Sequence, residues 1–136
     1  MTQIKYHVTQ SQNSTLNVGA AVGGNPTVGQ AQLVISGNNN YKKLVGVMLI
    51  ITDDEGNHYT KRATVSVSTT SGLLLVPEQP YACVRPSFNE KPADRILSID
   101  EVNGNGHDFR FQVSIPNLAE EPKSFDITAI CYFTNK

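Results

Sequence analysis

The longest apolar run in the sequence, residues 44–52, constrains the fold more than any other stretch. An acidic turn at 53–57 ends this run, and residues 59–67 then alternate between apolar and polar side chains. Two such segments around a Gly-containing turn predict a β-hairpin. Side chains alternate between the two faces of a strand, so an even register gives the hairpin one apolar face. We expect this core face to carry Leu44, Met48, Ile50, Ala63, Val65 and Val67.

The first strand of this predicted hairpin is apolar on both faces, whereas its partner is apolar on one. Burial stabilises by about 25 cal/mol per Å² of apolar surface, so large aliphatic side chains on the second face should also be covered. A loop, another strand or another subunit could cover them. A second candidate surface lies on the last predicted strand. The residues that we expect at an interface are Val45, Val47, Leu49, Ile51, Ile130 and Tyr132.

The rest of the chain reads as short strands separated by polar turns. Residues 31–35 alternate Ala, Leu and Ile with polar side chains, and 109–115 and 125–133 alternate in the same way. The Asn-Gly repeat at 103–106 predicts a second hairpin, and residues 10–14 read as a polar loop. About nine strand candidates with no amphipathic helix predict an all-β fold. We expect residues 1–136 to form one antiparallel β-sandwich, jelly-roll-like, with about eight or nine strands and little or no helix.

Composition narrows the classes of function. The net charge is −1 and the basic residues are scattered, so the chain lacks the basic stripe that binds nucleic acid. No segment is apolar and long enough to be a signal core or a membrane span. We therefore expect a protein that is made in the cytoplasm without a signal peptide. Cys83 and Cys131 could form one disulfide, although a strand cysteine such as Cys131 is commonly a buried free thiol.

Chemistry-bearing residues gather in the predicted turns without the spacing of a known site. Asp53 and Asp54 offer oxygen ligands, but their spacing does not fit a twelve-residue calcium loop. His58 and His107 could bind zinc only if two separate turns met in space. No nucleophile stands near a base or an oxyanion donor in the sequence. We expect no enzymatic activity, no cofactor and no metal.

Two non-enzymatic functions remain. The first is a structural or assembly protein of a virion, in which capsid, decoration or neck and tail proteins pair with copies of themselves or dock on a larger shell. Lack of a signal peptide, the Thr-, Asn- and Gly-rich composition and the surplus apolar face favour it. The alternative is a carbohydrate- or ligand-binding sandwich, lectin-like or adhesin-like, with its site on the loops. Its candidate residues are Asn39, Tyr41, Asp53, Asp54, Asn57, His58, Asn105 and His107.

Overall fold

The computed structural model describes residues 8–37, 43–56, 62–84, 97–103 and 108–134. Strands dominate this part of the chain, with one short 3-10 helix, η1, at Tyr81–Cys83. The strands are β1 (Val8–Val18), β2 (Thr27–Ser36), β3 (Lys43–Thr52), β4 (Thr64–Thr69), β5 (Leu74–Pro80), β6 (Leu97–Asn103), β7 (Asp108–Asn117) and β8 (Lys123–Thr134).

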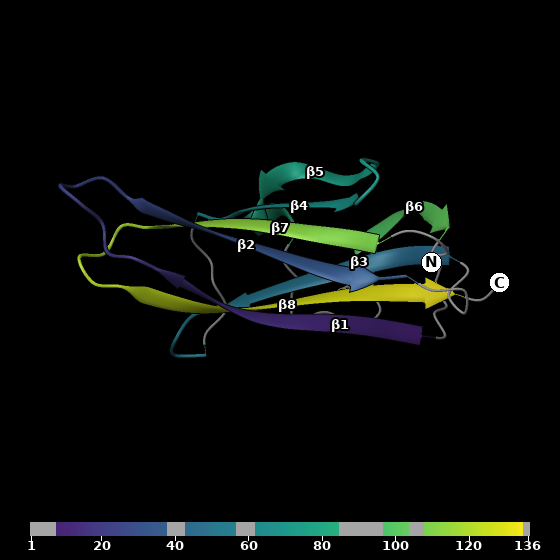
Figure 1. Cartoon of the computed structure of the whole chain (residues 1–136), viewed down its shortest axis with the longest axis horizontal. Helices are drawn as coiled ribbons and strands as arrows, with labels where there is room; N and C mark the ends of the chain where they lie inside the picture. The colour runs from purple at the N-terminus through teal and green to yellow at the C-terminus, as the bar shows by residue number, and fades with distance from the viewer. Residues whose placement is uncertain (1–7, 38–42, 57–61, 85–96, 104–107, 135–136) are drawn as a thin grey trace.

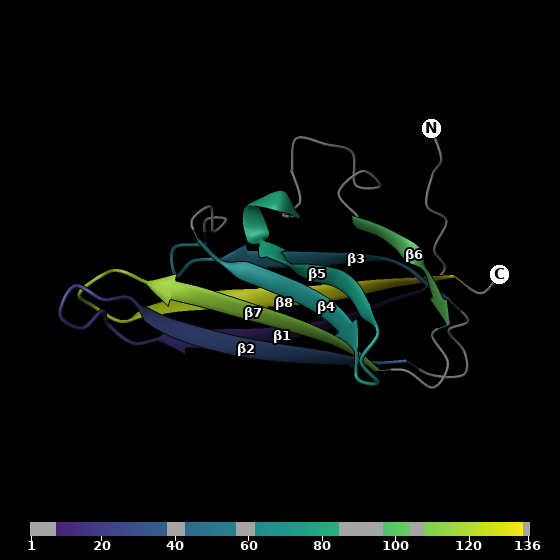
Figure 2. The same ribbon diagram turned by 90° about the horizontal axis from the view of Figure 1, so that it is seen from above.

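Two antiparallel sheets pack face to face to form a sandwich (Figure 1). Sheet I contains β1, β8 and β3 in that order and is extended at its edge by β6. Sheet II has the order β2-β7-β4-β5, and Figure 2 shows it lying across sheet I. The prediction of an all-β antiparallel sandwich is confirmed.

The strands pair from the two ends of the chain inwards. β1 pairs with β8, β2 with β7, β3 with β6, and β4 with β5. The chain thus forms one long two-stranded ribbon, which is rolled so that successive strand pairs enter alternate sheets. Further pairing of β3 with β8 and of β4 with β7 completes the sheets. This connectivity, built from eight strands and two Greek keys, is the jelly roll.

The core lies between the two sheets. It is made of the side chains that point inwards, which are about every second residue along a strand. On β7 and β8 every second residue is buried, as the sequence pattern predicts. Phe109 of sheet II meets Phe133 of sheet I with ring centroids 5.8 Å apart and planes tilted by 57°, a favourable aromatic geometry. These two strands supply nine of the core side chains, namely Phe109, Phe111, Val113, Ile115, Phe125, Ile127, Ala129, Cys131 and Phe133.

Both predicted hairpins are wrong. β3 belongs to sheet I and β4 to sheet II, so the acidic turn leads from one sheet to the other. β6 and β7 are likewise in different sheets, on either side of the Asn-Gly repeat. The physical reason is that β3, apolar on both faces, lies inside a sheet between β8 and β6, where it has a strand on each side.

A β-bulge near the start of β3 also reverses the predicted faces of that strand. Leu44 pairs with Phe133 and Gly46 with Tyr132, so two steps on β3 match one step on β8. A bulge of this kind moves every later side chain to the other face. Leu44 stays in the core, but beyond the bulge the core side chains are Val47, Leu49 and Ile51, whereas Met48 and Ile50 point outwards.

β1 is longer than predicted and includes the polar segment that we read as a loop. It pairs residue by residue with β8, from Val8 opposite Phe133 to Val18 opposite Lys123. The polar residues suit this position because β1 is an edge strand of sheet I. A β-strand can therefore form here without a strong apolar pattern, because β8 supplies the partner.

Tyr81 links the two sheets. It follows β5 of sheet II, is 1% exposed, and its hydroxyl accepts a hydrogen bond of 3.1 Å from the backbone N–H of Ile51 on β3. Within the described residues, the pairing of β3 with β6 runs from Lys43 to Val47 and does not reach Ile51. A buried N–H costs about 1–3 kcal/mol when unpaired, so this hydrogen bond satisfies the Ile51 N–H and ties the segment after β5 to sheet I.

Candidate functional site

A small apolar cluster lies on the outer face of sheet I, separate from the main core. We call it the outer cluster; Met48 and Tyr132 are its best-buried members, and the Tyr132 hydroxyl lies 3.9 Å from the Met48 sulfur. Adjacent strands β3 and β8 place the cluster at the centre of the sheet, where the bulge turns alternate side chains outwards. Its members are Val45, Met48, Ile50, Ile130 and Tyr132.

The outer cluster contains only part of the predicted interface. Val45, Ile130 and Tyr132 belong to it, and their role at an interface stays a prediction. Val47, Leu49 and Ile51 do not, because they are 2%, 5% and 0% exposed in the main core. Their expected position on a free face is therefore wrong, and the bulge is the reason.

A second apolar surface lies at the end of the sandwich where two loops meet. Val22 and Leu118 in these loops are 73% and 63% exposed, and Val28 at the start of β2 is 54% exposed. We call these three residues the apolar tip. Val28 also pairs with Pro116 across β2 and β7, which adds apolar surface beside it. In Figure 1 the β1–β2 and β7–β8 loops project together beyond the sheets at this end.

Hydrogen bonds fix the loops that carry the apolar tip. The Asn117 side chain is 4% exposed, and its Nδ2 donates to the backbone oxygens of Gly19 and Glu121 at 3.0 and 2.9 Å. Its Oδ1 accepts from the Ala119 N–H at 3.0 Å, and the Ala21 N–H donates to the Ala119 oxygen at 2.8 Å. The tip is therefore an ordered surface, which loses little conformational entropy when a partner binds.

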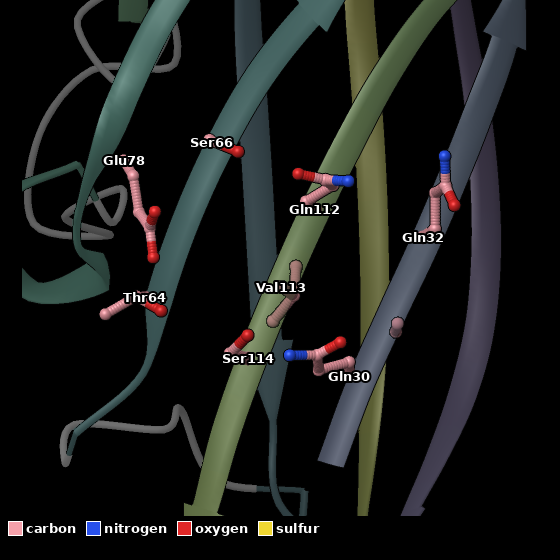
Figure 3. Close-up of a pocket in the computed structure, with 9 residues that line it drawn as sticks. Gln30, Gln32, Thr64, Ser66, Glu78, Gln112, Val113 and Ser114 are labelled. Carbon is pink, nitrogen blue, oxygen red and sulfur yellow. The ribbon is translucent and has the colours of Figure 1, made fainter. Parts of the chain in front are cut away.

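The outer face of sheet II has the opposite character. A groove of about 420 Å³ crosses it, lined mostly by amide and hydroxyl side chains (Figure 3). Gln112 of β7 lies between Gln32 of β2 and Ser66 of β4, and the next row places Ser114 between Gln30 and Thr64. Glu78 of β5 completes the polar lining, while Ala31 and Val113 form its floor. We call this feature the polar groove.

The sequence matches no family model and no curated protein. The jelly roll itself occurs in viral capsid proteins, lectins and cupins, so the fold does not decide among these functions. The outer cluster, the apolar tip and the polar groove are the surface features that bear on function.

The acidic turn uses its first aspartate to build the turn. Asp53 Oδ1 accepts the Glu55 N–H at 2.9 Å, and its backbone oxygen accepts the Gly56 N–H at 3.1 Å. Gly56 has φ +81°, a conformation that glycine adopts without strain. Asp53 and Asp54 are the two described members of the predicted ligand loops. The other six, Asn39, Tyr41, Asn57, His58, Asn105 and His107, lie outside the described residues.

The described ranges contain neither a metal-binding cluster nor a membrane-spanning helix. Within them, no group of three or more His, Cys, Asp or Glu side chains could hold a metal ion. No helix among these residues is long and apolar enough to cross a membrane. Of the described tyrosines, Tyr81 and Tyr132 are 1% and 7% exposed, so neither offers a flat ring to a ligand.

The two cysteines are free and differ in exposure. Burial raises the pKa of the Cys131 thiol well above its usual range, because the thiolate would have to form in the apolar core. Cys83 is exposed. We expect a thiol reagent at pH 8 to modify Cys83 alone in the folded protein and both cysteines in denaturant, with the stoichiometry measured by intact mass. Modification of both cysteines under native conditions, or of neither in denaturant, would contradict this arrangement.

Sequence reasoning missed the polar groove. Its signal was visible strand by strand, because residues 30 and 32 and residues 112 and 114 are polar positions between apolar ones. What could not be seen was that β2, β7 and β4 are neighbours, since they are far apart in the sequence. The apolar tip was missed for the same reason: the loops that carry residues 22 and 118, joined by the hydrogen bond from the Ala21 N–H to the Ala119 oxygen, are far apart in the sequence.

Proposed function

We propose that this protein is a non-enzymatic structural protein of a virion, a capsid, decoration or neck and tail component that associates with copies of itself or with a larger shell. The apolar tip is the observation that carries the proposal. Three aliphatic side chains that are more than half exposed lie towards one end of the fold, Val22 and Leu118 on ordered loops and Val28 at the start of β2. Apolar surface that is held outside the core in this way is typical of protein–protein contacts.

The jelly-roll topology supports the same proposal. Sheets that pack face to face leave the loops at the two ends of the sandwich free to contact neighbouring subunits. A stable interface buries about 1,200–2,000 Å² in total, far more than three side chains supply. The apolar tip would thus form the centre of a contact whose rim comes from the loop residues around it. The protein would work in the virion after synthesis in the cytoplasm.

The oligomeric state tests this proposal. We expect the wild-type protein to self-associate as its concentration rises in sedimentation velocity runs. Leu118→Glu should shift the species towards monomer, because a carboxylate at the centre of an interface loses its hydration. Its melting temperature should stay close to that of the wild type, because Leu118 is 63% exposed.

A matched control uses the same substitution elsewhere. Leu73, in the β4–β5 connection, is 53% exposed and is not part of the apolar tip. Leu73→Glu should leave self-association unchanged. A wild-type protein that stays monomeric at every concentration, or an equal effect of both substitutions, would refute the role of the apolar tip in self-association.

The alternative of a carbohydrate- or ligand-binding module has a separate support, the polar groove. It lies on a sheet face rather than on the loops where the sequence placed such a site. The two functions use different surfaces, so one protein can carry both.

A further inference from the structure

We infer that the polar groove of sheet II binds a neutral carbohydrate. This inference deepens the alternative function and does not depend on self-association through the apolar tip. The volume of the polar groove, about 420 Å³, falls within the usual range of small-ligand sites, about 300–1,000 Å³.

The hydrogen-bonding groups of the groove match a polyhydroxylated ligand. Each glutamine side chain offers an NH₂ group that donates two hydrogen bonds and an oxygen that accepts. Each hydroxyl can donate or accept a hydrogen bond. A sugar hydroxyl also donates and accepts, so amides and hydroxyls can bind it in both senses. The groove presents three amides and three hydroxyls in two rows, from Gln30, Gln32, Gln112, Thr64, Ser66 and Ser114.

These side chains are not engaged with one another. No hydrogen bond joins any two side chains of the groove within the described residues. In Figure 3 the Gln112 amide and the Ser66 hydroxyl project from neighbouring strands on the same side of the sheet. Neighbouring strands lie about 4.8 Å apart, and this spacing separates the residues within each row. Because the strands belong to one sheet, the backbone positions of the polar residues are fixed before a ligand arrives.

Charge argues for a neutral ligand. Among the described residues that line the groove, Glu78 alone is charged. Arg110 lies one row away on β7, and its Nε is shielded from solvent with no hydrogen-bond partner. With one carboxylate in the described lining, and with Arg110 and Asp108 on the same face of β7, the face carries no strong charge of one sign, so neither a phosphate nor a polycation is favoured. A protein partner is also disfavoured, because protein interfaces are enriched in aromatic side chains and the described lining residues include none.

A lining without aromatic rings among the described residues predicts weak binding. A flat ring that stacks on a sugar supplies much of the apolar contact area of a carbohydrate site. Without it, we expect a Kd on the order of 1 mM for a disaccharide. Several copies in one assembly would raise the apparent affinity through multivalency.

The test is a titration followed by NMR, which reports the side-chain NH₂ signals of glutamine directly. The probes are neutral disaccharides of glucose, galactose and mannose, with a sialylated and a sulfated sugar for comparison. We expect at least one neutral sugar to give saturable shifts of the amide signals of Gln30, Gln32 and Gln112.

Two variants locate the site. Gln112→Ala should weaken binding by roughly fivefold or more, since it removes the amide at the centre of the groove. Gln12→Ala is the matched control, because Gln12 is an exposed glutamine on β1 of the other sheet, and it should bind like the wild type. Both positions are exposed, so both variants should fold, and the backbone spectrum checks this.

Three results would overturn the inference. They are the absence of saturable shifts with every neutral sugar at tenfold the expected Kd, binding of the anionic sugars alone, and equal effects of the two variants. Each of these results leaves the proposal on self-association untouched, because the sedimentation experiment measures a different surface.

Discussion

Leu49→Glu should unfold the protein, whereas the same substitution at the next residue, Ile50, should leave it folded. Leu49 is 5% exposed in the main core, and Ile50 packs in the outer cluster on the opposite face of β3. Loss of the buried leucine side chain alone costs about 2–5 kcal/mol, and a carboxylate without a partner in the core adds several more. The sum is comparable with the whole stability of a domain, about 5–15 kcal/mol.

Ile50→Glu should cost far less, about 1 kcal/mol, because its side chain is only partly buried and a carboxylate there can reach water. Circular dichroism and thermal unfolding of both variants measure the contrast. Leu49→Met and Ile50→Met are the controls, since they keep the apolar volume and should both fold. If Ile50→Glu unfolds and Leu49→Glu does not, β3 has no bulge and the faces alternate without interruption.

This contrast marks the limit of what the sequence could predict. β7 alternates apolar core residues with mostly polar outward residues. The core residues of β2 and β8 keep the same two-residue spacing, although Val34, Ile130 and Tyr132 are apolar on the outer side, so these core faces were read correctly. β3 is apolar on both faces, and a shift by one residue therefore leaves no polar side chain in the core to reveal it. Gly46 was the single local sign of the bulge.

Strand pairing was out of reach for a different reason. Tight turns in the sequence favour pairing between neighbours along the chain, and both predicted hairpins followed that rule. In the jelly roll the longest ladder joins β1 to β8, with Val8 opposite Phe133, so the partner is set by the whole ribbon. The candidate surfaces depend on this pairing, because the apolar tip and the polar groove each combine residues from distant strands.

The approach of β2 to β1 can be tested at Gly29. Gly29 faces inwards where the two strands cross between the sheets, and a Cβ built there would lie 2.6 Å from Cγ2 of Val18. Val18 is 1% exposed and branched at Cβ, so its methyl group cannot easily turn aside. The backbone of Gly29 does not need a positive φ, so alanine is opposed by side-chain contacts and not by the backbone, and the contact with Val18 Cγ2 is the shortest.

Gly29→Ala should therefore destabilise the protein by about 1–3 kcal/mol and lower the melting temperature by roughly 4–12 °C. Without the close contact, alanine in a strand would instead stabilise the protein by about 0.5–1 kcal/mol. The sign of the change in stability therefore shows whether the contact with Val18 exists. Val18→Ala removes the clashing methyl group and should partly rescue Gly29→Ala in a double-mutant cycle, although it opens a cavity by itself. A stabilising Gly29→Ala, or effects of the two substitutions that simply add, would show that β1 and β2 do not touch here. The small residues of this segment would then have no packing role, and the ordered base on which the apolar tip rests would lose its support.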